Sequence, residues 1–297
     1  MRGDPAIHGV RPRVAVPCRC VLGEGPVWDG RTGTLMWVDI RAGELLSWRP
    51  AEGGAADVRS LGEPVSFVAL TPDPGTVLVG LASGIGRLRL ASGAPERILR
   101  PEPDRVGHRL NDGNVAPDGS LWFGSMDDAE AEPTGMFYRW SAGGLRAFGE
   151  ATVVTNGPLV DGDRALAYTA DTSGGRVFRH RLDGNGDPGP AEPLIEFGKG
   201  DGHPDGLTLD AEGHLWVCHF GGARVTRFTP EGEAVLAVPM PTAQVTKVAF
   251  GGPDLATLYV TTAARGHDPE IEPLAGHLFA FEVEGVSGRP AAHCSMG

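Results

Sequence analysis

A short pattern of two apolar runs joined by a turn recurs through the chain at nearly regular intervals. Each turn is rich in Asp, Gly and Pro, residues that accept the tight or left-handed backbone conformations a β-hairpin needs. The first runs of the six copies begin at Gly25, Ser66, Gly113, Gly157, Gly206 and Val248. After most copies a third and a fourth strand follow, as in 176–181 and 191–197. Four strands in about 40–50 residues are typical of a β-propeller blade.

The six copies predict an all-β fold, a six-bladed β-propeller. A strand near 14–16 is expected to close the ring by joining the last blade beside 277–281. We therefore expect a flexible N-terminal tail over 1–12 and a single propeller domain over 13–297. Two packed β-sandwiches are the alternative, but the regular period and the lack of a Pro/Ser-rich boundary disfavour them.

The composition narrows the classes of partner. The net charge is −12 and no basic block occurs, which argues against nucleic-acid binding. No apolar run approaches the roughly 20 residues of a membrane span, and the N-terminus lacks a signal-peptide core, so no membrane association is expected. Four cysteines without a CxxC pair favour a reduced, cytoplasmic location. We expect a monomer or a weak homo-oligomer.

Four polar residues stand directly before a glycine where a first run begins: Glu24, Asp112, Asn156 and Asp205. In a propeller the innermost strands line a central channel, so these side chains should converge at one channel mouth. Crowded carboxylates are costly unless a cation neutralises them. Oxygen ligands suit a hard or intermediate divalent cation such as Ca²⁺, Mg²⁺ or Mn²⁺. Asp-Gly and Asn-Gly are also ordinary turn dipeptides; what distinguishes this set is its place before the first strand of a repeat.

Several motifs resemble the SMP-30/gluconolactonase/regucalcin family over about residues 20–265. They are 22–28 (LGEGPVW) with 37–40 (WVDI), 109–113 (RLNDG), 155–157 (TNG), 204–206 (PDG) with 210–217 (DAEGHLWV), and 250–252 (FGG). The resemblance implies a six-bladed propeller with one divalent metal, for which Ca²⁺, Zn²⁺, Mn²⁺, Mg²⁺ and Fe(II) are all candidates. It implies that Glu24, Asn156 and Asp205 hold this metal, and that Arg109 and Asn111 contact substrate or metal-bound solvent.

One stretch departs from the family pattern. Some members carry a Glu after the third inner hairpin that helps to hold the sugar, whereas residues 124–128 here read GSMDD. We expect Asp127 to substitute for it, with Asp128 as the alternative. The 156–158 variant, Asn-Gly-Pro, looks more like bacterial sugar-acid pathway lactonases than animal regucalcin.

The resulting hypothesis is hydrolysis of a sugar lactone, a cyclic ester, to the sugar acid. The metal would act as a Lewis acid and would acidify bound water, and Asp205 would be both ligand and general base. Arg109, with its planar donors, and Asn111, which donates and accepts at once, would bind substrate oxygens. Asp112 would either hydrogen-bond substrate or only orient its loop. His108 and His203 could act as proton shuttles or be merely solvated.

Two other functions remain open. One is a metal-dependent propeller hydrolase of another ester or of a phosphotriester, and the other is a non-enzymatic calcium-binding propeller. The chain has no GxSxG nucleophile elbow and no HExxH, which weakens the serine-esterase and zincin readings.

Overall fold

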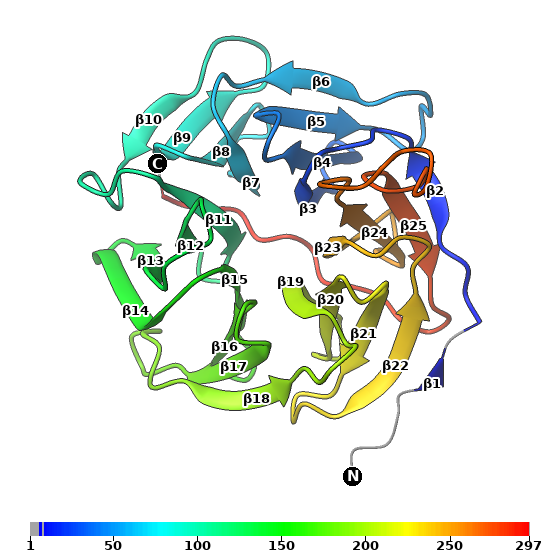
Figure 1. The fold of residues 1–297 in the computed structure, drawn as a ribbon. Helices are drawn as coiled ribbons and strands as arrows, with labels where there is room; N and C mark the ends of the chain where they lie inside the picture. The colour runs from blue at the N-terminus through cyan, green and yellow to red at the C-terminus, as the bar shows by residue number, and fades with distance from the viewer. Residues whose placement is uncertain (1–5, 8, 297) are drawn as a thin grey trace.

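A computed structural model describes residues 6–7 and 9–296. In this part of the chain the regular structure is entirely β, and the strands form six sheets arranged as blades around one central axis (Figure 1). The predicted six-bladed β-propeller is thereby confirmed. No helix in the described residues is long and apolar enough to cross a membrane.

The blades follow one another around the ring, and each runs from an inner strand at the channel to an outer strand at the rim. Blade 1 consists of β3 (Gly23–Asp29), β4 (Thr34–Asp39), β5 (Glu44–Trp48) and β6 (Asp57–Ser60). Blade 2 consists of β7 (Val65–Leu70), β8 (Thr76–Leu81), β9 (Gly84–Arg89) and β10 (Glu96–Leu99). Blade 3 consists of β11 (His108–Val115), β12 (Leu121–Asp127), β13 (Gly135–Ser141) and β14 (Gly144–Thr152). Blade 4 consists of β15 (Thr155–Asp161), β16 (Leu166–Asp171), β17 (Arg176–Arg181) and β18 (Glu192–Glu196). Blade 5 contains β19 (His203–Leu209), β20 (Leu215–Phe220), β21 (Arg224–Phe228) and β22 (Ala234–Pro239). Blade 6 consists of β23 (Val245–Gly251), β24 (Thr257–Thr262) and β25 (Leu278–Glu282), and is completed by β2 (Arg13–Val16).

An N-terminal strand closes the ring. β2 pairs antiparallel with β25, with Arg13 opposite Ala280, so the predicted closure is confirmed. Within 1–12, the stretch predicted to be a flexible tail, β1 (Ala6–Ile7) instead pairs in parallel with the rim strand β22 of blade 5. Residues 1–5 and 8 lie outside the described residues. The pair Ala6–Ile7 adds a fifth strand to the sheet of blade 5.

Large aromatic side chains hold neighbouring blades together. Trp37, Trp122 and Trp216 occupy the second strand of blades 1, 3 and 5 and are at most 1% exposed. Apolar clusters extend from each sheet to the next; one of them joins Cys218 of blade 5 to Phe279 of blade 6. Burying this apolar area is the main favourable contribution to folding. It also fixes the relative positions of the inner strands, on which the site described below depends.

The inner strand of every blade is interrupted at the same level by a shift in its pairing register. The shifts lie between residues 24 and 27, 65 and 67, 110 and 113, 156 and 159, 204 and 207, and 245 and 248. A bulge of this kind frees a residue from the ladder and re-aims its side chain. The polar–glycine pairs of four blades fall at this level. In blades 2 and 6 the buried hydroxyls of Ser66 and Thr246 take their place.

Candidate active site

Glu24 lies at the bulge of blade 1 and is only 4% exposed. Its Oε2 accepts a 2.7 Å hydrogen bond from the Gly25 amide, while Oε1 has no hydrogen-bond partner among the described residues. Burial, followed by the charge of Asp112, raises the pKa of Glu24 to about 8, against an attraction from Lys247. A buried carboxylate with a free oxygen and a raised pKa is a group that lacks a counter-charge.

Asp205 occupies the equivalent position in blade 5. Burial, and then the charges of Glu24 and Asp112, raise the pKa of Asp205 well above its ordinary value. The three carboxylates lie at the bulge level of blades 1, 3 and 5, and therefore at one end of the channel. The next residue is glycine because a Cβ at position 206 would overlap the Lys247 side chain of blade 6. The missing side chain lets the two inner strands approach each other closely.

Two consecutive hydrogen bonds fix the orientation of the Asn156 side-chain amide in blade 4. Thr172 Oγ1 donates to the Pro204 carbonyl (2.8 Å), so it must accept the hydrogen bond from Asn156 Nδ2 (2.8 Å). The amide oxygen, Oδ1, is therefore the atom left for the channel, where its one hydrogen bond from the described residues is a long one, 3.4 Å from Asn111 Nδ2. An oxygen held this way suits a cation, because outer hydrogen bonds orient metal ligands.

Asp112 of blade 3 is fully engaged by protein groups. Its Oδ1 accepts from the Gly113 amide (2.7 Å) and from the Lys247 ammonium, and its Oδ2 accepts from the Gly157 amide (3.1 Å). Burial raises the pKa of Asp112, and the pairing with Lys247 opposes that rise. With both oxygens occupied, Asp112 offers less to a metal than Glu24 or Asp205 does.

The charges at this end of the channel do not balance within the protein. Glu24, Asp112 and Asp205 contribute three negative charges, and Lys247 contributes one positive charge, which leaves a formal charge of −2 in a buried setting. Two carboxylates and one amide oxygen remain available for a cation. This donor set fits a divalent ion that prefers oxygen ligands.

Arg109 and Asn111 lie beside this cluster and are held rigidly. Arg109 Nε donates to Asp128 Oδ1 (2.7 Å), and its Nη1 donates to Asn111 Oδ1 (2.7 Å). Nη2 has no hydrogen-bond partner among the described residues. Asn111 Nδ2 donates to the Thr155 carbonyl (2.6 Å), which ties blade 3 to blade 4. Burial lowers the pKa of Arg109, and the bond to Asp128 opposes this, so the guanidinium keeps its charge.

The two candidate aspartates after β12 have different tasks. Asp127 accepts hydrogen bonds from the amides of residues 129, 131 and 132, and so organises its own loop. Asp128 instead accepts from Arg109 and from Arg41 of blade 1. These bonds outweigh the effect of burial and hold the pKa of Asp128 below its ordinary value. Asp128 is thus the carboxylate that faces the channel mouth.

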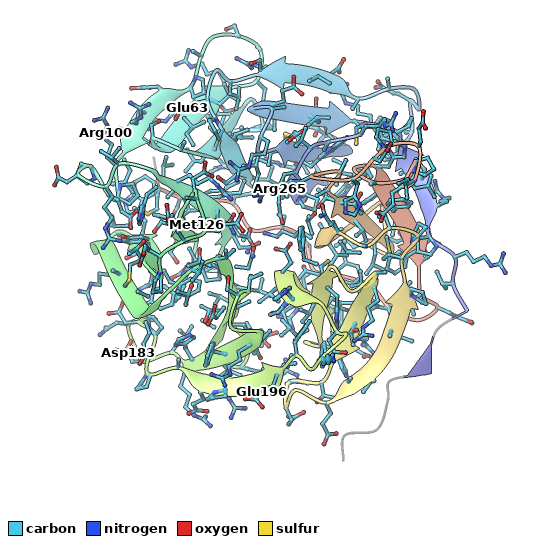
Figure 2. The ribbon with its side chains drawn as sticks, in the orientation of Figure 1. Glu63, Arg100, Met126, Asp183, Glu196 and Arg265 are labelled. Carbon is cyan, nitrogen blue, oxygen red and sulfur yellow. The ribbon has the colours of Figure 1, made fainter. Side chains whose placement is uncertain are left out.

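Ion pairs reach across this mouth from other blades. Arg265, in the loop after β24, donates from Nη1 to Glu130 Oε1 of the blade 3 loop (2.6 Å), and Arg41 pairs with Asp128 (2.8 Å). Figure 2 shows Arg265 nearer the centre of the ring than Arg100, which lies towards the rim. The pairs join blades 1 and 6 to blade 3 above the polar end of the channel.

The nearby histidines have other partners. His108 Nδ1 lies 2.9 Å from Glu102 Oε2 and its Nε2 lies 3.0 Å from Thr134 Oγ1. His203 is exposed, with Nδ1 3.0 Å from the Thr172 carbonyl. Neither ring contacts Glu24 or Asp205, so the structure offers no support for a proton shuttle at either histidine.

A second acidic group lies at the other end of blade 5. The ligand atoms of Asp210, Glu212 and His214 all lie within 4.8 Å of one another, the one such trio of Asp, Glu, His or Cys found in the described residues. Arg227 already donates to Asp210 Oδ2 (2.7 Å) and to Glu212 Oε2 (2.5 Å). Asp210 also accepts from the Trp216 indole and from two amides. The guanidinium supplies the counter-charge here, so this trio is a weaker candidate for a metal.

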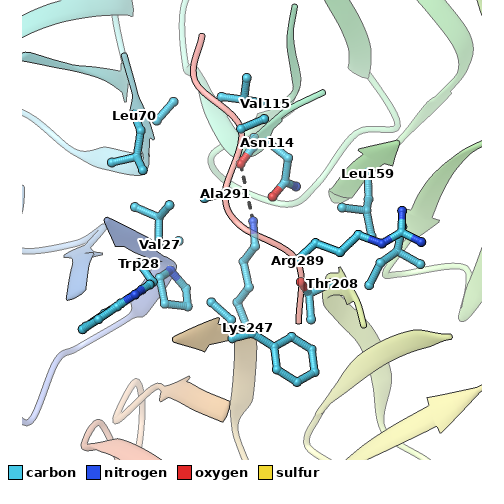
Figure 3. A pocket seen from close by; sticks show the side chains of 18 of the residues that line it. Val27, Trp28, Leu70, Asn114, Val115, Leu159, Thr208, Lys247, Arg289 and Ala291 are labelled. Carbon is cyan, nitrogen blue, oxygen red and sulfur yellow. Dashed lines mark hydrogen bonds between the residues drawn. The ribbon is translucent and has the colours of Figure 1, made fainter. Parts of the chain in front are cut away.

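Beyond the carboxylates, the channel widens into a cavity of about 170 Å³. Its walls are largely apolar and include Val27, Leu70 and Leu159, and Lys247 extends across it towards blade 3 (Figure 3). The C-terminal segment crosses the far mouth (red in Figure 1): the Ser287 carbonyl accepts from the Ala211 amide, and the Cys294 amide donates to Leu70. Lys247 therefore lies between the polar end of the channel and the end that the C-terminal segment crosses.

Lys247 is the site residue that the sequence analysis missed. It lies in an apolar run, 245–250, and is only 3% exposed. A buried lysine is rare unless it is paired. Its position at the bulge level of the sixth inner strand was a usable signal, because the acidic residues of the other blades occupy that level.

Comparisons with known proteins show which proteins this chain is similar to. The protein-family model for the SMP-30/Gluconolactonase/LRE-like region matches residues 22–264 of this chain. A 6-deoxy-6-sulfogluconolactonase from Pseudomonas putida is 36% identical over 268 residues, which cover 89% of this chain and 91% of that protein. An L-arabinolactonase from Azospirillum brasilense is 35% identical over 272 residues, 89% of each chain. The crystal structure of a calcium-binding protein, regucalcin, from Agrobacterium tumefaciens has a TM-score of 0.93 at 30% identity, covering 99% of this chain and 100% of that chain.

Proposed function

The chain belongs to the SMP-30/gluconolactonase/LRE-like family, and we propose that it is a lactonase that hydrolyses a sugar lactone to the sugar acid with the help of one divalent metal ion. The observation that carries this proposal is the buried cluster of Glu24, Asp205 and the Asn156 amide oxygen, which together lack a counter-charge. Relatives named as sugar lactonases align with this chain over about nine-tenths of its length.

We assign the metal to Glu24, Asn156 and Asp205. Each comes from the bulge level of a different blade, so the propeller ring sets their separation. The neutral amide of Asn156 limits the negative charge of the ligand set. A divalent cation bound there would supply Lewis acidity at the lactone carbonyl.

Asp205 is the proposed general base. Burial, followed by the charges of Glu24 and Asp112, raises the pKa of Asp205, which makes its carboxylate a stronger proton acceptor. In the reaction, the oxygen of a water molecule bonds to the carbonyl carbon while its proton passes to the Asp205 carboxylate. The bond between that carbon and the ring oxygen then breaks, and the proton is returned to the departing oxygen. No oxidant or further co-reactant is needed.

Arg109 and Asn111 are the proposed substrate contacts. The unpaired Nη2 of Arg109 can donate to a hydroxyl or carbonyl oxygen. Of the two aspartates after β12, we propose Asp128 as the carboxylate that helps to hold the sugar, because it already orients Arg109 and faces the channel mouth. Asp127 accepts hydrogen bonds from amides of its own loop, and Asp112 accepts hydrogen bonds from inner-strand amides and from Lys247. These polar groups favour a polyol over the more apolar substrate of a phosphotriesterase-like enzyme.

The test is hydrolysis of a panel of aldonolactones, followed with a pH indicator. We expect wild-type protein to acidify the medium with Ca²⁺, Mn²⁺ or Zn²⁺ present, and to lose this activity in a chelator. Glu24→Gln and Asp205→Asn should lose at least about 100-fold in kcat/KM, in line with the loss of a group used in the chemical step.

Asp210→Asn is the matched control, since it removes a buried carboxylate from the other end of blade 5. This variant should keep its lactonase activity and its chelator sensitivity. If no lactone is opened with any of the three metals, the function is wrong. If Glu24→Gln and Asp205→Asn remain fully active, the site assignment is wrong although the function stands.

A further inference from the structure

A buried ion pair spans the channel beside the proposed metal ligands. Lys247 lies on β23 of blade 6 and Asp112 lies on β11 of blade 3, 135 residues earlier in the chain. Their side chains are 4% and 1% exposed. Leaving one member of such a pair without the other is far more costly than removing both, because the remaining charge is buried and uncompensated.

The stem of Lys247 runs close to one of the metal ligands. Its Cβ and Cγ pack on the backbone of Gly206, the residue that follows Asp205, so closely that a Cβ there would overlap them. The charge of the Lys247 ammonium also lowers the pKa of both Glu24 and Asp205 against the effect of burial. The ammonium is therefore near enough to act on both ligands while being bound to neither.

Asp112 is the group that determines where the ammonium lies. Apart from Asp112 Oδ1, Nζ has one acceptor among the described residues, the Gly113 carbonyl at 3.5 Å, which is at the limit of a hydrogen bond. Asp112 is itself fixed by the amides of Gly113 and Gly157, so it cannot follow the lysine elsewhere. Without the Asp112 carboxylate, the nearest negative partners for a buried ammonium would be Glu24 and Asp205.

We propose that Asp112 is a positioning residue that holds the Lys247 ammonium off Glu24 and Asp205 and so keeps the channel end open to a divalent cation. The inference rests on the proposed metal site. Asp112 sets the charge of the pocket at −2 and prevents an internal cation from taking the place of the metal. Its role is separate from substrate binding and from direct coordination.

The experiment is isothermal titration of the full-length, metal-stripped protein with Ca²⁺ and, separately, with Mn²⁺ at pH 7.5. Asp112→Asn should weaken binding at least about 10-fold, about 1.4 kcal/mol, because the freed ammonium pairs with the ligands. The double variant Asp112→Asn with Lys247→Met should recover binding to within about threefold of wild type. Lys247→Met alone should bind the cation at least as tightly as wild type does.

Lys247→Met separates this role from a merely structural one. This variant also breaks the ion pair, so a protein that needed the pair only for folding would bind the cation more weakly, whereas the proposed role of Asp112 predicts binding at least as tight as in wild type. Asp161→Asn is the control: it removes a fully buried carboxylate, paired with Arg164 and Arg289, from the far end of blade 4. It should lower the melting temperature and leave the cation affinity unchanged.

Two results would overturn the proposal: wild-type affinity in Asp112→Asn, or a double variant as weak as the single one. If the wild-type protein itself binds neither cation, the metal-dependent function fails first, and that outcome is recognised before any variant is compared.

Discussion

In the metal-free protein, Glu24 is a buried carboxylate that opposes folding at neutral and alkaline pH. Replacing it with glutamine keeps the shape of the side chain and an oxygen for the Gly25 amide, but removes the charge. We therefore predict that Glu24→Gln stabilises the chelated protein at high pH, although the same change removes a proposed metal ligand.

The direction of this effect on stability follows from the number of protons that the folded and unfolded states bind. The pKa of Glu24 rises from 4.5 to about 8 on folding, so the folded state holds a proton that the unfolded state has lost. The stability this contributes is complete below pH 4.5 and is lost as the pH rises to about 8. At 1.36 kcal/mol for each pKa unit, the loss is at most about 4–5 kcal/mol. The difference between the two proteins removes the contribution of titrating groups that do not interact with Glu24. The charge of Glu24 also raises the pKa of Asp205, so its removal adds to the effect in the same direction.

The assay is urea unfolding of both proteins in excess EDTA, at pH 5 and at pH 8.5. The two proteins should be nearly equal at pH 5, and Glu24→Gln should be more stable by roughly 3–5 kcal/mol at pH 8.5. Saturating Ca²⁺ or Mn²⁺ should reverse the order, because only the wild type keeps the full ligand set. A variant no more stable than wild type at pH 8.5 in EDTA would refute the argument that Glu24 lacks a counter-charge.

Three further substitutions test neighbouring groups. Asp128→Asn should lower kcat/KM about 10- to 100-fold, mainly through KM, because it removes the charge-assisted bond that holds Arg109. Asp127→Asn should change kcat/KM by less than about threefold in the same lactone assay, since it contacts only its own loop; equal losses in the two would contradict the assignment. Gly206→Ala should lower the free energy of unfolding by about 1–3 kcal/mol, because the new methyl group overlaps Lys247. An unchanged melting curve for this variant would show that the inner strands are less closely packed than described.

The fold could be predicted from the sequence because its signals are local. Each hairpin turn lies between the two strands that it joins, so six copies at a regular spacing predict the ring. The ring closure by β2 was also within reach, since a strand left over at the N-terminus has one open blade to complete. The parallel pairing of Ala6–Ile7 with β22 was not, because it depends on where the chain runs before β2 completes blade 6.

The sequence could predict the site residues that lie at repeated positions of the inner strands. It could not predict those whose position depends on the conformation of a loop. Glu24, Asp112 and Asp205 lie at the bulge level of three inner strands, at one end of the channel. Lys247 was missed because its partner lies on the opposite blade, 135 residues away. The choice between adjacent aspartates after β12 could not be made from sequence, because the loop conformation alone determines which carboxylate faces inwards.

The most direct test of the metal assignment is a crystal grown with Mn²⁺ and a product sugar acid, measured for anomalous scattering. The account predicts one strong peak about 2.0–2.6 Å from oxygens of Glu24, Asn156 and Asp205, with the sugar acid contacting Arg109. A peak at Asp210, Glu212 and His214 with none at the channel end would contradict it.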